Sequence, residues 1–304
     1  MTLPKIVIAT RASALALWQA ESVRAALLRA NLAREVELLE LTTEGDRRLA
    51  QKLSAIGGKG LFVKELETAL AEGRADIAVH SMKDVPMVLP EGFAIACTMK
   101  REKANDVFIS SRYARLEDMP EGAVVGTSSL RREMFLRRLR PGVKIVSVRG
   151  NVATRLRKLD EGFCDALVMA YAGIHRLGLD DRIAQVLPEE RFLPSPGQGA
   201  LAVECLETRG DLRQALATLD DAASATETAC EREVSRLLGG SCQVPLAAYA
   251  VTRGETLGLR AAIGNETTGE VLETRLSGSS RDPIGLARRA VEALLAQGAS
   301  RFVR

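Results

Sequence analysis

Hydroxyl and arginine side chains follow apolar, strand-like segments at three places in the chain. These side chains are Arg11 and Ser13, then Ser129, Arg131 and Arg132, and finally Arg149. In an open α/β sheet, ligands bind at the carboxyl ends of the strands, and the free N–H groups of a following helix attract anions. Arginine opposes the helix dipole at such a position, where aspartate or glutamate would be stabilising. The three junctions therefore predict a cleft for a ligand with several negative charges.

Two more arginines, Arg155 and Arg176, lie near the ends of predicted strands or in the first turn of the next helix. A guanidinium group binds a carboxylate through two hydrogen bonds and stays charged in any environment. A cleft lined by arginines therefore suits carboxylates or phosphates. For the segment 128–140 alone, a solvated basic face is an equally good interpretation, because its other arginines fit that arrangement.

One carboxylate, Asp84, stands among these cations at the end of a predicted strand, next to Lys83. An anionic aspartate in such a cleft would stabilise a cationic intermediate or move a proton. The local sequence alone favours a structural alternative, in which Asp84 caps the turn before Pro86. His80, in the preceding strand, is expected to be a packed strand residue rather than a catalyst.

A glycine-rich segment at residues 57–60 has the composition of a phosphate loop but not its spacing, because Leu61 follows directly. A mobile lid that carries Lys59 is the better interpretation.

The five cysteines form no Cys-x-x-Cys pair, and their odd number argues against a disulfide framework or a zinc site. Two histidines are too few for most histidine-based metal sites, so no metal is expected, although carboxylate-bound magnesium stays open. Four cysteines lie in strand or helix patterns and are interpreted as small core residues. Cys242 differs because it follows a helix on a Gly-Gly-Ser loop, where a thiol is accessible to modification.

The composition narrows the class of protein. The chain has 304 residues, of which 46% are hydrophobic and 27% charged, with a net charge of only +3. This charge argues against a general nucleic-acid-binding protein, and 4% aromatic residues leave few stacking platforms for single strands. No apolar run approaches the ~20 residues of a membrane span, and the first residues lack a signal-peptide pattern. The expectation is a cytoplasmic protein.

Strand and helix patterns alternate through most of the chain, which predicts α/β units with parallel strands and crossover helices. The pattern restarts after residue 105, and a Pro- and Gly-rich segment at 194–199 has the composition of a hinge. We therefore expect two α/β lobes with a cleft between them, followed by a small C-terminal α+β domain. The expected domains are 1–99 with 200–217, then 105–193, and then 222–304 with Cys242.

Together these features resemble the porphobilinogen deaminase (hydroxymethylbilane synthase) family over nearly the whole chain. The most specific stretches are residues 9–13 with 17–19, 57–65, 75–86, 125–132, 149–155, 193–204 and 239–245. The resemblance implies a transferase of tetrapyrrole and haem biosynthesis, with a covalent dipyrromethane cofactor thioether-linked to Cys242. Four porphobilinogen units would be deaminated and added to this primer, and linear hydroxymethylbilane would be released by hydrolysis. Each ring carries an acetate and a propionate, in agreement with an arginine-lined cleft.

The resemblance also implies roles for individual residues. Asp84 would be the catalytic carboxylate, which helps to expel ammonia and stabilises the cationic azafulvene that results. Lys59 would belong to the loop that covers the cleft. The residues that would bind the ring carboxylates are Arg11, Ser13, Lys83, Ser129, Arg131, Arg132, Arg149, Arg155 and Arg176. The family's architecture implies two lobes like those of periplasmic solute-binding proteins, a third domain with the cysteine, and a monomer.

Two other classes compete with this interpretation. A solute-binding protein would share the two-lobed fold, because fold alone does not fix function. It would carry a secretion signal and would not need an attachment cysteine. A phosphate-ligand enzyme such as a phosphotransferase would need a complete phosphate loop and an acidic metal cluster, which the sequence lacks. A covalently bound dipyrrole would distinguish the deaminase from both.

Overall fold

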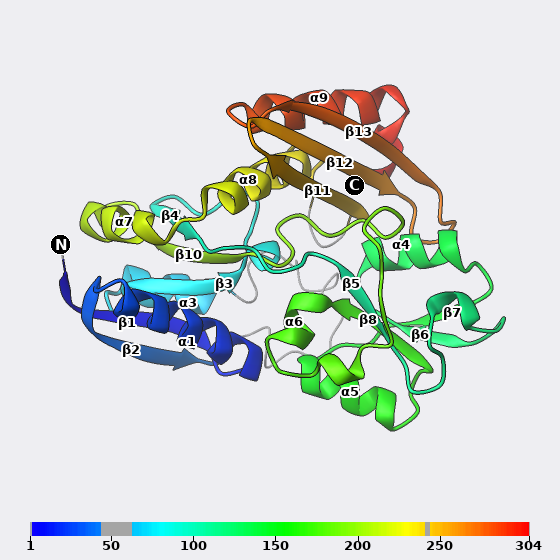
Figure 1. Cartoon of the computed structure of the whole chain (residues 1–304), viewed down its shortest axis with the longest axis horizontal. Helices are drawn as coiled ribbons and strands as arrows, with labels where there is room; N and C mark the ends of the chain where they lie inside the picture. The colour runs from blue at the N-terminus through cyan, green and yellow to red at the C-terminus, as the bar shows by residue number, and fades with distance from the viewer. Residues whose placement is uncertain (1, 44–62, 241–243, 304) are drawn as a thin grey trace. The chain divides into compact units, whose positions relative to one another are not determined.

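The computed structural model describes residues 2–43, 63–240 and 244–303. By their contacts these residues form two compact units. The first comprises Met1–Glu102 and Ala200–Ala225, and the second comprises Lys103–Gly199 and Thr226–Arg304. Each unit contains a five-stranded sheet with helices, and the second also contains a three-stranded sheet near the C-terminus (Figure 1). The predicted α/β fold class with an additional small C-terminal α+β part is confirmed; the cleft expected between the lobes stays a prediction.

The sheet of the first unit has the strand order β2-β1-β3-β10-β4. Its strands are β1 (Leu3–Arg11), β2 (Ala33–Leu41), β3 (Ile77–Ser81), β4 (Phe93–Thr98) and β10 (Leu201–Leu206). β1 is parallel to β2 and β3, whereas β10 runs antiparallel to β3 and β4. The ends of β1 and β3 therefore meet at one edge of the sheet, where Arg11 and Ser81 lie.

Helices cover this sheet: α1 (Ala14–Arg29), α3 (Lys64–Ala71) and α7 (Gly210–Leu216), the last followed by the short helix η5 (Ala217–Leu219). Ser13 caps α1, because its side chain accepts a hydrogen bond from the N–H of Ala16 at 3.4 Å. The buried face of α1 carries Ala20, Val23 and Leu27, which pack with Ile6 and Ile8 of β1. This packing fixes the start of α1 beside the end of β1.

The five-stranded sheet of the second unit has the order β7-β6-β8-β5-β9. Its strands are β5 (Asp106–Ile109), β6 (Val124–Gly126), β7 (Lys144–Val146), β8 (Ala166–Ala170) and β9 (Gln185–Val186). β6 is parallel to β7 and β8, and β5 is antiparallel to β8 and β9. The helices are α4 (Leu130–Leu139), α5 (Val152–Asp160) and α6 (Tyr171–His175), with the short helices η3 (Leu116–Asp118) and η4 (Asp180–Arg182).

The C-terminal part begins after α8 (Ala222–Leu237) and consists of β11 (Leu246–Arg253), β12 (Thr256–Gly264), β13 (Val271–Ser279), α9 (Pro283–Ala296) and η6 (Ala299–Phe302). The three strands are antiparallel neighbours in chain order. Alternate residues of β12, such as Leu257 and Leu259, pack in one core with Leu286 and Leu294 of α9. The sheet is thus packed on one face against α9, as Figure 1 shows, which is the small α+β arrangement expected for this part of the chain.

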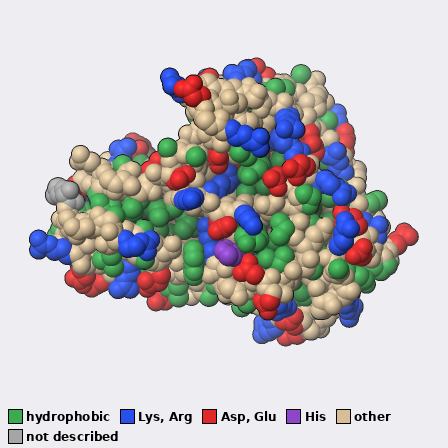
Figure 2. Space-filling view, viewed as in Figure 1, with side chains coloured by type: hydrophobic (Ala, Val, Ile, Leu, Met, Phe, Trp, Pro, Cys, Tyr) green, Lys and Arg blue, Asp and Glu red, His purple; other side chains and the backbone are tan. Residues whose placement is uncertain are grey.

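The expectation of parallel strands is only partly correct. β10 and β5 are antiparallel members of their sheets, so each sheet is mixed. β4, β9, α6 and α7 were not predicted from the sequence. None of the helices in the described ranges has the length and hydropathy of a membrane span. Acidic and basic side chains are interspersed over the face drawn in Figure 2, in keeping with the small net charge.

Candidate functional site

A small pocket in the first unit collects residues from the end of β1, the start of α1 and the end of β3. Its lining residues are Arg11, Ser13, Leu15, Ala16, Gln19, Val63, Val79, His80, Ser81 and Asp84. The volume is about 70 Å³. This space accommodates a carboxylate group or a few water molecules, but not a two-ring ligand. The pocket thus brings together three residues predicted from sequence: Arg11, Ser13 and Asp84.

Buried apolar residues anchor the turn that carries Asp84. After β3 the chain forms the short helix η2 (Met82–Asp84). Met82 and Val85 are 1% and 2% exposed, and the N–H of Met82 donates to the carbonyl of Ala200 at 3.0 Å. With both neighbours buried, Asp84 stays exposed and lines the pocket. This exposed position in the pocket is compatible with the catalytic role predicted for Asp84, and that role stays a prediction beside the alternative that Asp84 caps the turn.

Two polar residues of the pocket, Gln19 and Ser81, were not predicted from the sequence. Gln19 is 4% exposed, and its amide donates to the hydroxyl of Ser81 at 2.8 Å. A signal was present, because Gln19 lies three residues after Ala16 and four before Val23, on the buried face of α1. A polar residue on such a face needs a partner.

His80 lies in the pocket wall and contacts a buried carboxylate. Its Nε2 is 2.8 Å from Oε2 of Glu204 in β10, and the two residues are 7% and 0% exposed. Glu67 of α3 interacts with both. Burial, reinforced by the charge of Glu204 and opposed by His80, raises the pKa of Glu67. His80 is a packed strand residue as expected, but its charged partner was not foreseen.

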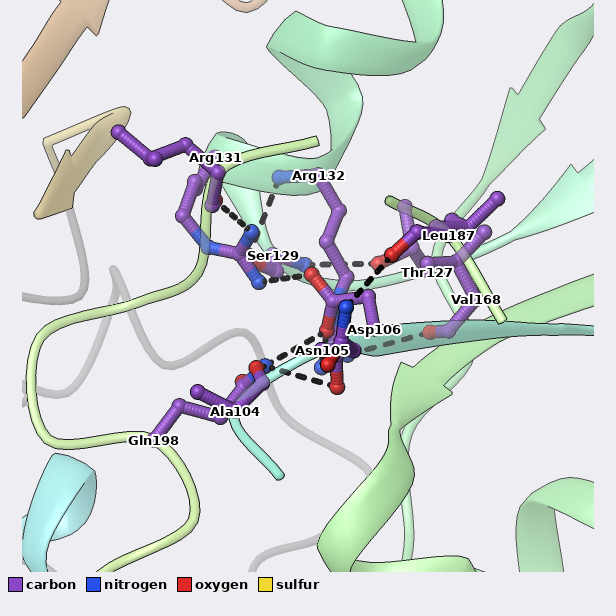
Figure 3. Close-up of polar contacts among 11 residues, drawn as sticks. Ala104, Asn105, Asp106, Thr127, Ser129, Arg131, Arg132, Val168, Leu187 and Gln198 are labelled. Carbon is purple, nitrogen blue, oxygen red and sulfur yellow. Dashed lines mark hydrogen bonds and ion pairs between the residues drawn. The ribbon is translucent and has the colours of Figure 1, made fainter. Parts of the chain in front are cut away.

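A buried cluster in the second unit joins two of the predicted arginines to one aspartate, Asp106 (Figure 3). Nη2 of Arg131 donates to Asp106 at 2.6 Å, and Nη2 and Nε of Arg132 donate to it at 2.8 and 3.1 Å. The amide of Gln198 donates to the same carboxylate at 3.0 Å. Arg131 and Arg132 are 4% and 6% exposed, and Asp106 is fully buried. These arginines are therefore not the exposed basic face that their helix alone allowed.

The electrostatics of this cluster leave a surplus of positive charge. Burial acts to raise the pKa of Asp106, but the charges and hydrogen bonds of Arg131 and Arg132 outweigh it and hold that pKa below its usual value. Burial, partly offset by Asp106, lowers the pKa of Arg131. One carboxylate thus faces two guanidinium groups. Among the described residues, Nε of Arg131 has no hydrogen-bond partner although it is buried.

The remaining predicted residues of this unit lie at the starts or ends of helices. Ser129 caps α4 by accepting a hydrogen bond from the N–H of Arg132 at 3.5 Å. Arg149 follows β7 in the segment before α5. Nε of Arg155 donates to the carbonyl of Gly150 at 2.7 Å, and Nη2 of Arg176 donates to that of Gly199 at 2.7 Å. All four side chains are half-buried, whereas those of a solvated basic face would be exposed.

Three further predictions concern residues elsewhere. Lys59 and Cys242 lie outside the described residues. Lys83 is in η2, half-buried beside Asp84. The other four cysteines, Cys97, Cys164, Cys205 and Cys230, are free and buried, as expected of core residues. The described residues contain no group of histidine, cysteine and carboxylate side chains that could hold a metal ion.

Comparisons with known proteins give consistent matches. The sequence model for the porphobilinogen deaminase dipyrromethane cofactor binding domain matches residues 6–214, and that for the porphobilinogen deaminase C-terminal domain matches residues 225–296. Porphobilinogen deaminase from Burkholderia pseudomallei (strain 668) is 52% identical over 301 residues, covering 98% of this chain and 92% of the relative. The protein of the same name from Burkholderia vietnamiensis is 50% identical over 301 residues, covering 98% and 90%.

Among solved structures, the methionine-binding protein MetQ aligns with a TM-score of 0.45 and 14% identity, covering 78% of this chain and 96% of that one. A TM-score at this level supports no inference about function.

Proposed function

This chain belongs to the porphobilinogen deaminase family, and on that premise we propose that it is a transferase with a dipyrromethane cofactor bound covalently through Cys242. It adds four porphobilinogen units in turn, releases ammonia at each addition and frees linear hydroxymethylbilane by hydrolysis. The substrate is a small molecule with two carboxylates per ring. The observation that carries the proposal beyond family membership is the buried cluster of two arginines with one aspartate.

The residues of this cluster fit an anionic cofactor. A surplus guanidinium charge in a buried place is costly unless a further anion compensates it. Arg131 has a buried Nε–H without a partner among the described residues, so it retains a donor for a carboxylate. The dipyrromethane supplies carboxylates of this kind and the carbon at which the first porphobilinogen is joined. We assign Arg131 and Arg132 to its carboxylates, with Ser129, Arg149, Arg155 and Arg176 in the same role.

The pocket of the first unit suits the step in which ammonia leaves. A positive charge develops on the substrate as its C–N bond breaks, and an exposed carboxylate in a small pocket stabilises that charge. Asp84 supplies this carboxylate. Arg11, Ser13 and Lys83 bind the carboxylates of the substrate, and Arg11 and Ser13 line the pocket with Asp84. Lys59 belongs to a loop that covers the bound ligand.

We also propose that the chain works as a monomer in the cytoplasm, without a nucleic-acid or membrane partner. The family leads to the monomer. Free thiols at Cys97, Cys164, Cys205 and Cys230 are typical of a reducing compartment.

Replacement of Asp84 tests the function at its chemical centre. Asp84→Asn keeps the size of the side chain but removes the charge that faces the developing cation. We expect normal cofactor content by intact mass and a turnover number lowered about 100- to 10,000-fold. Glu91→Gln, at an exposed position a few residues later, is the matched control and should leave turnover unchanged. Turnover of Asp84→Asn within a few-fold of the wild type would remove Asp84 from this role.

A further inference from the structure

We propose that His80 accepts the proton released at each addition and that Glu204 is the positioning residue for its imidazole. The inference rests on the proposed function, because it assigns a proton acceptor to that reaction. The buried pair of His80 and Glu204 has no other part in the proposed reaction.

The protons and electrons of one addition show why an acceptor is required. The amino group of porphobilinogen leaves from its protonated, ammonium form: when the C–N bond breaks, nitrogen keeps the electron pair and departs as ammonia, and the carbon becomes positively charged. The new C–C bond forms at a pyrrole carbon that carried hydrogen. That carbon then loses its proton, and the electron pair of the C–H bond returns to the ring. Each addition therefore releases one proton without oxidation or reduction.

The imidazole of His80 can supply a lone pair for this proton. Its Nε2 lies 2.8 Å from Oε2 of Glu204, and the two atoms form no hydrogen bond, so the contact is electrostatic. A neutral imidazole carries its hydrogen on one ring nitrogen and keeps a lone pair on the other. His80 also lines the pocket that contains Asp84.

Stability alone does not account for this pair. A buried ion pair is often no more stabilising than well-packed apolar residues of similar size. Glu204 is completely buried in β10 between apolar neighbours, where a hydrophobic residue would fit the strand pattern. The carboxylate orients the ring and compensates the charge that the imidazole gains, as in other acid–base pairs.

Charged groups surround the imidazole from several elements. Glu204 comes from β10, and Glu67 from α3, where it interacts with both members of the pair. Arg11 of β1 and Asp84 of η2 line the same pocket. Glu204 and Glu67 are therefore the carboxylates whose charges act on the pair, and Asp84 and Arg11 are charged groups of the same pocket. The proton that the imidazole accepts passes to water or ammonia before the next addition.

The test compares pH profiles of turnover for the holoenzyme and three variants at saturating porphobilinogen. His80→Gln and Glu204→Gln change the pair, and His175→Gln is the matched control, since His175 is exposed and pairs with Asp180 at 2.9 Å. We expect His80→Gln to lower kcat about 10- to 100-fold with KM little changed and to remove the contribution of His80 from the acid limb of the profile, leaving that of the Asp84 carboxylate. Glu204→Gln should keep that limb but move its midpoint to lower pH by about 1 unit, because an opposite charge near the imidazole is lost.

Profiles of His80→Gln and Glu204→Gln that match the wild type in shape and midpoint would overturn the proposal. A purely structural role would lower kcat without moving the profile, and would overturn it equally. Intact mass measured on each protein reports cofactor content separately. A wild-type chain that carries no dipyrrole would refute the proposed function, and this inference with it.

A second measurement needs no variant. The chain has only two histidines, so ¹⁵N spectra of the imidazoles give two sets of signals, with His175 as an internal reference. Addition of porphobilinogen to the holoenzyme should shift the His80 nitrogens toward the protonated form and leave those of His175 in place. His80 signals that do not respond to substrate would contradict the proposal even where Glu204→Gln fails to fold.

Discussion

At the scale of residues, the second unit depends on one carboxylate that compensates two arginines. Asp106 accepts hydrogen bonds from Arg131, Arg132 and Gln198, and none of its surface is exposed. A buried charge that loses its partner is more costly than the pair is stabilising. Asp106 is therefore the residue on which the position of both guanidinium groups depends.

Asp106→Asn should lower the free energy of unfolding by about 3 to 5 kcal/mol, measured by denaturant titration of the apo chain. Because the pKa of Asp106 is lowered in the fold, its contribution is present above its unfolded value of about 4 and is lost as pH falls through the lower folded value. The difference between wild type and variant should therefore shrink below about pH 4. Asp160→Asn, in an exposed pair with Arg182, is the control, with an expected loss of about 1 kcal/mol or less. Equal losses for the two variants would contradict the buried-charge account.

Glu67 gives a prediction of opposite sign. The pKa of Glu67 is raised in the fold, so the folded state binds the proton of its carboxyl group more tightly than the unfolded state does. The corresponding stability is complete below the unfolded pKa of about 4.3 and is lost as pH rises through the folded value. Glu67→Gln should therefore raise the melting temperature at neutral pH, by on the order of 1 °C, and have no effect in acid. Glu72→Gln, at the exposed C-cap of the same helix, should leave the melting temperature unchanged at both pH values. A lower melting temperature for Glu67→Gln at neutral pH would refute the assignment.

At the scale of elements, helix N-termini position the predicted ligand-binding residues. Ser13 caps α1 and Ser129 caps α4, so each hydroxyl already has a structural role beside its proposed ligand. Ser is a preferred N-cap residue, and the arginines beside these two caps oppose the helix dipole, so their ligand-binding role stays a prediction. For Ser129, the capping role and the ligand-binding role can be tested separately with variants that keep the cap but differ in charge.

Ser129→Asn and Ser129→Asp both keep a capping side chain, but only the second adds a negative charge beside Arg131 and Arg132. We expect similar melting temperatures for the two variants, with aspartate favoured slightly by the helix dipole. Cofactor content, measured by intact mass, should be normal in Ser129→Asn and strongly reduced in Ser129→Asp, because the added carboxylate competes for the same guanidinium groups. Full cofactor content in Ser129→Asp would argue against carboxylate binding at this helix start.

The elements also show which parts of the fold the sequence patterns predict and which they do not. The sequence predicts strands at 166–170 and 201–206, which are the bounds of β8 and β10, because each is a short apolar run between polar or turn residues. β4 was missed because its segment is rich in alanine and its partner β10 lies more than a hundred residues later. For the same reason Asp106 and Glu204 were not recognised as buried. Their partners Arg131 and His80 lie on other elements, and only the fold brings them together.

At the scale of the whole molecule, the net charge of the protein should become more negative with each ring that the proposed reaction adds. The chain alone has a formal net charge of +3, and each added ring brings two carboxylates. Anion-exchange chromatography of holoenzyme given limiting porphobilinogen should therefore separate a series of species. Each species with one more ring should elute later than the one before it. Asp84→Asn should show the holoenzyme and little of the series. A single species under these conditions would contradict stepwise addition.

The most direct test of the account is the mass of the purified protein, with peptide mapping around Cys242. We predict an excess equal to two linked pyrrole units that survives denaturation and lies on the Cys242 peptide, while the peptide of the buried thiol Cys205 is unmodified. An unmodified Cys242, in protein that also gains no mass when supplied with porphobilinogen, would contradict the proposed function. A two-lobed protein that binds anions without catalysis would then be the better interpretation.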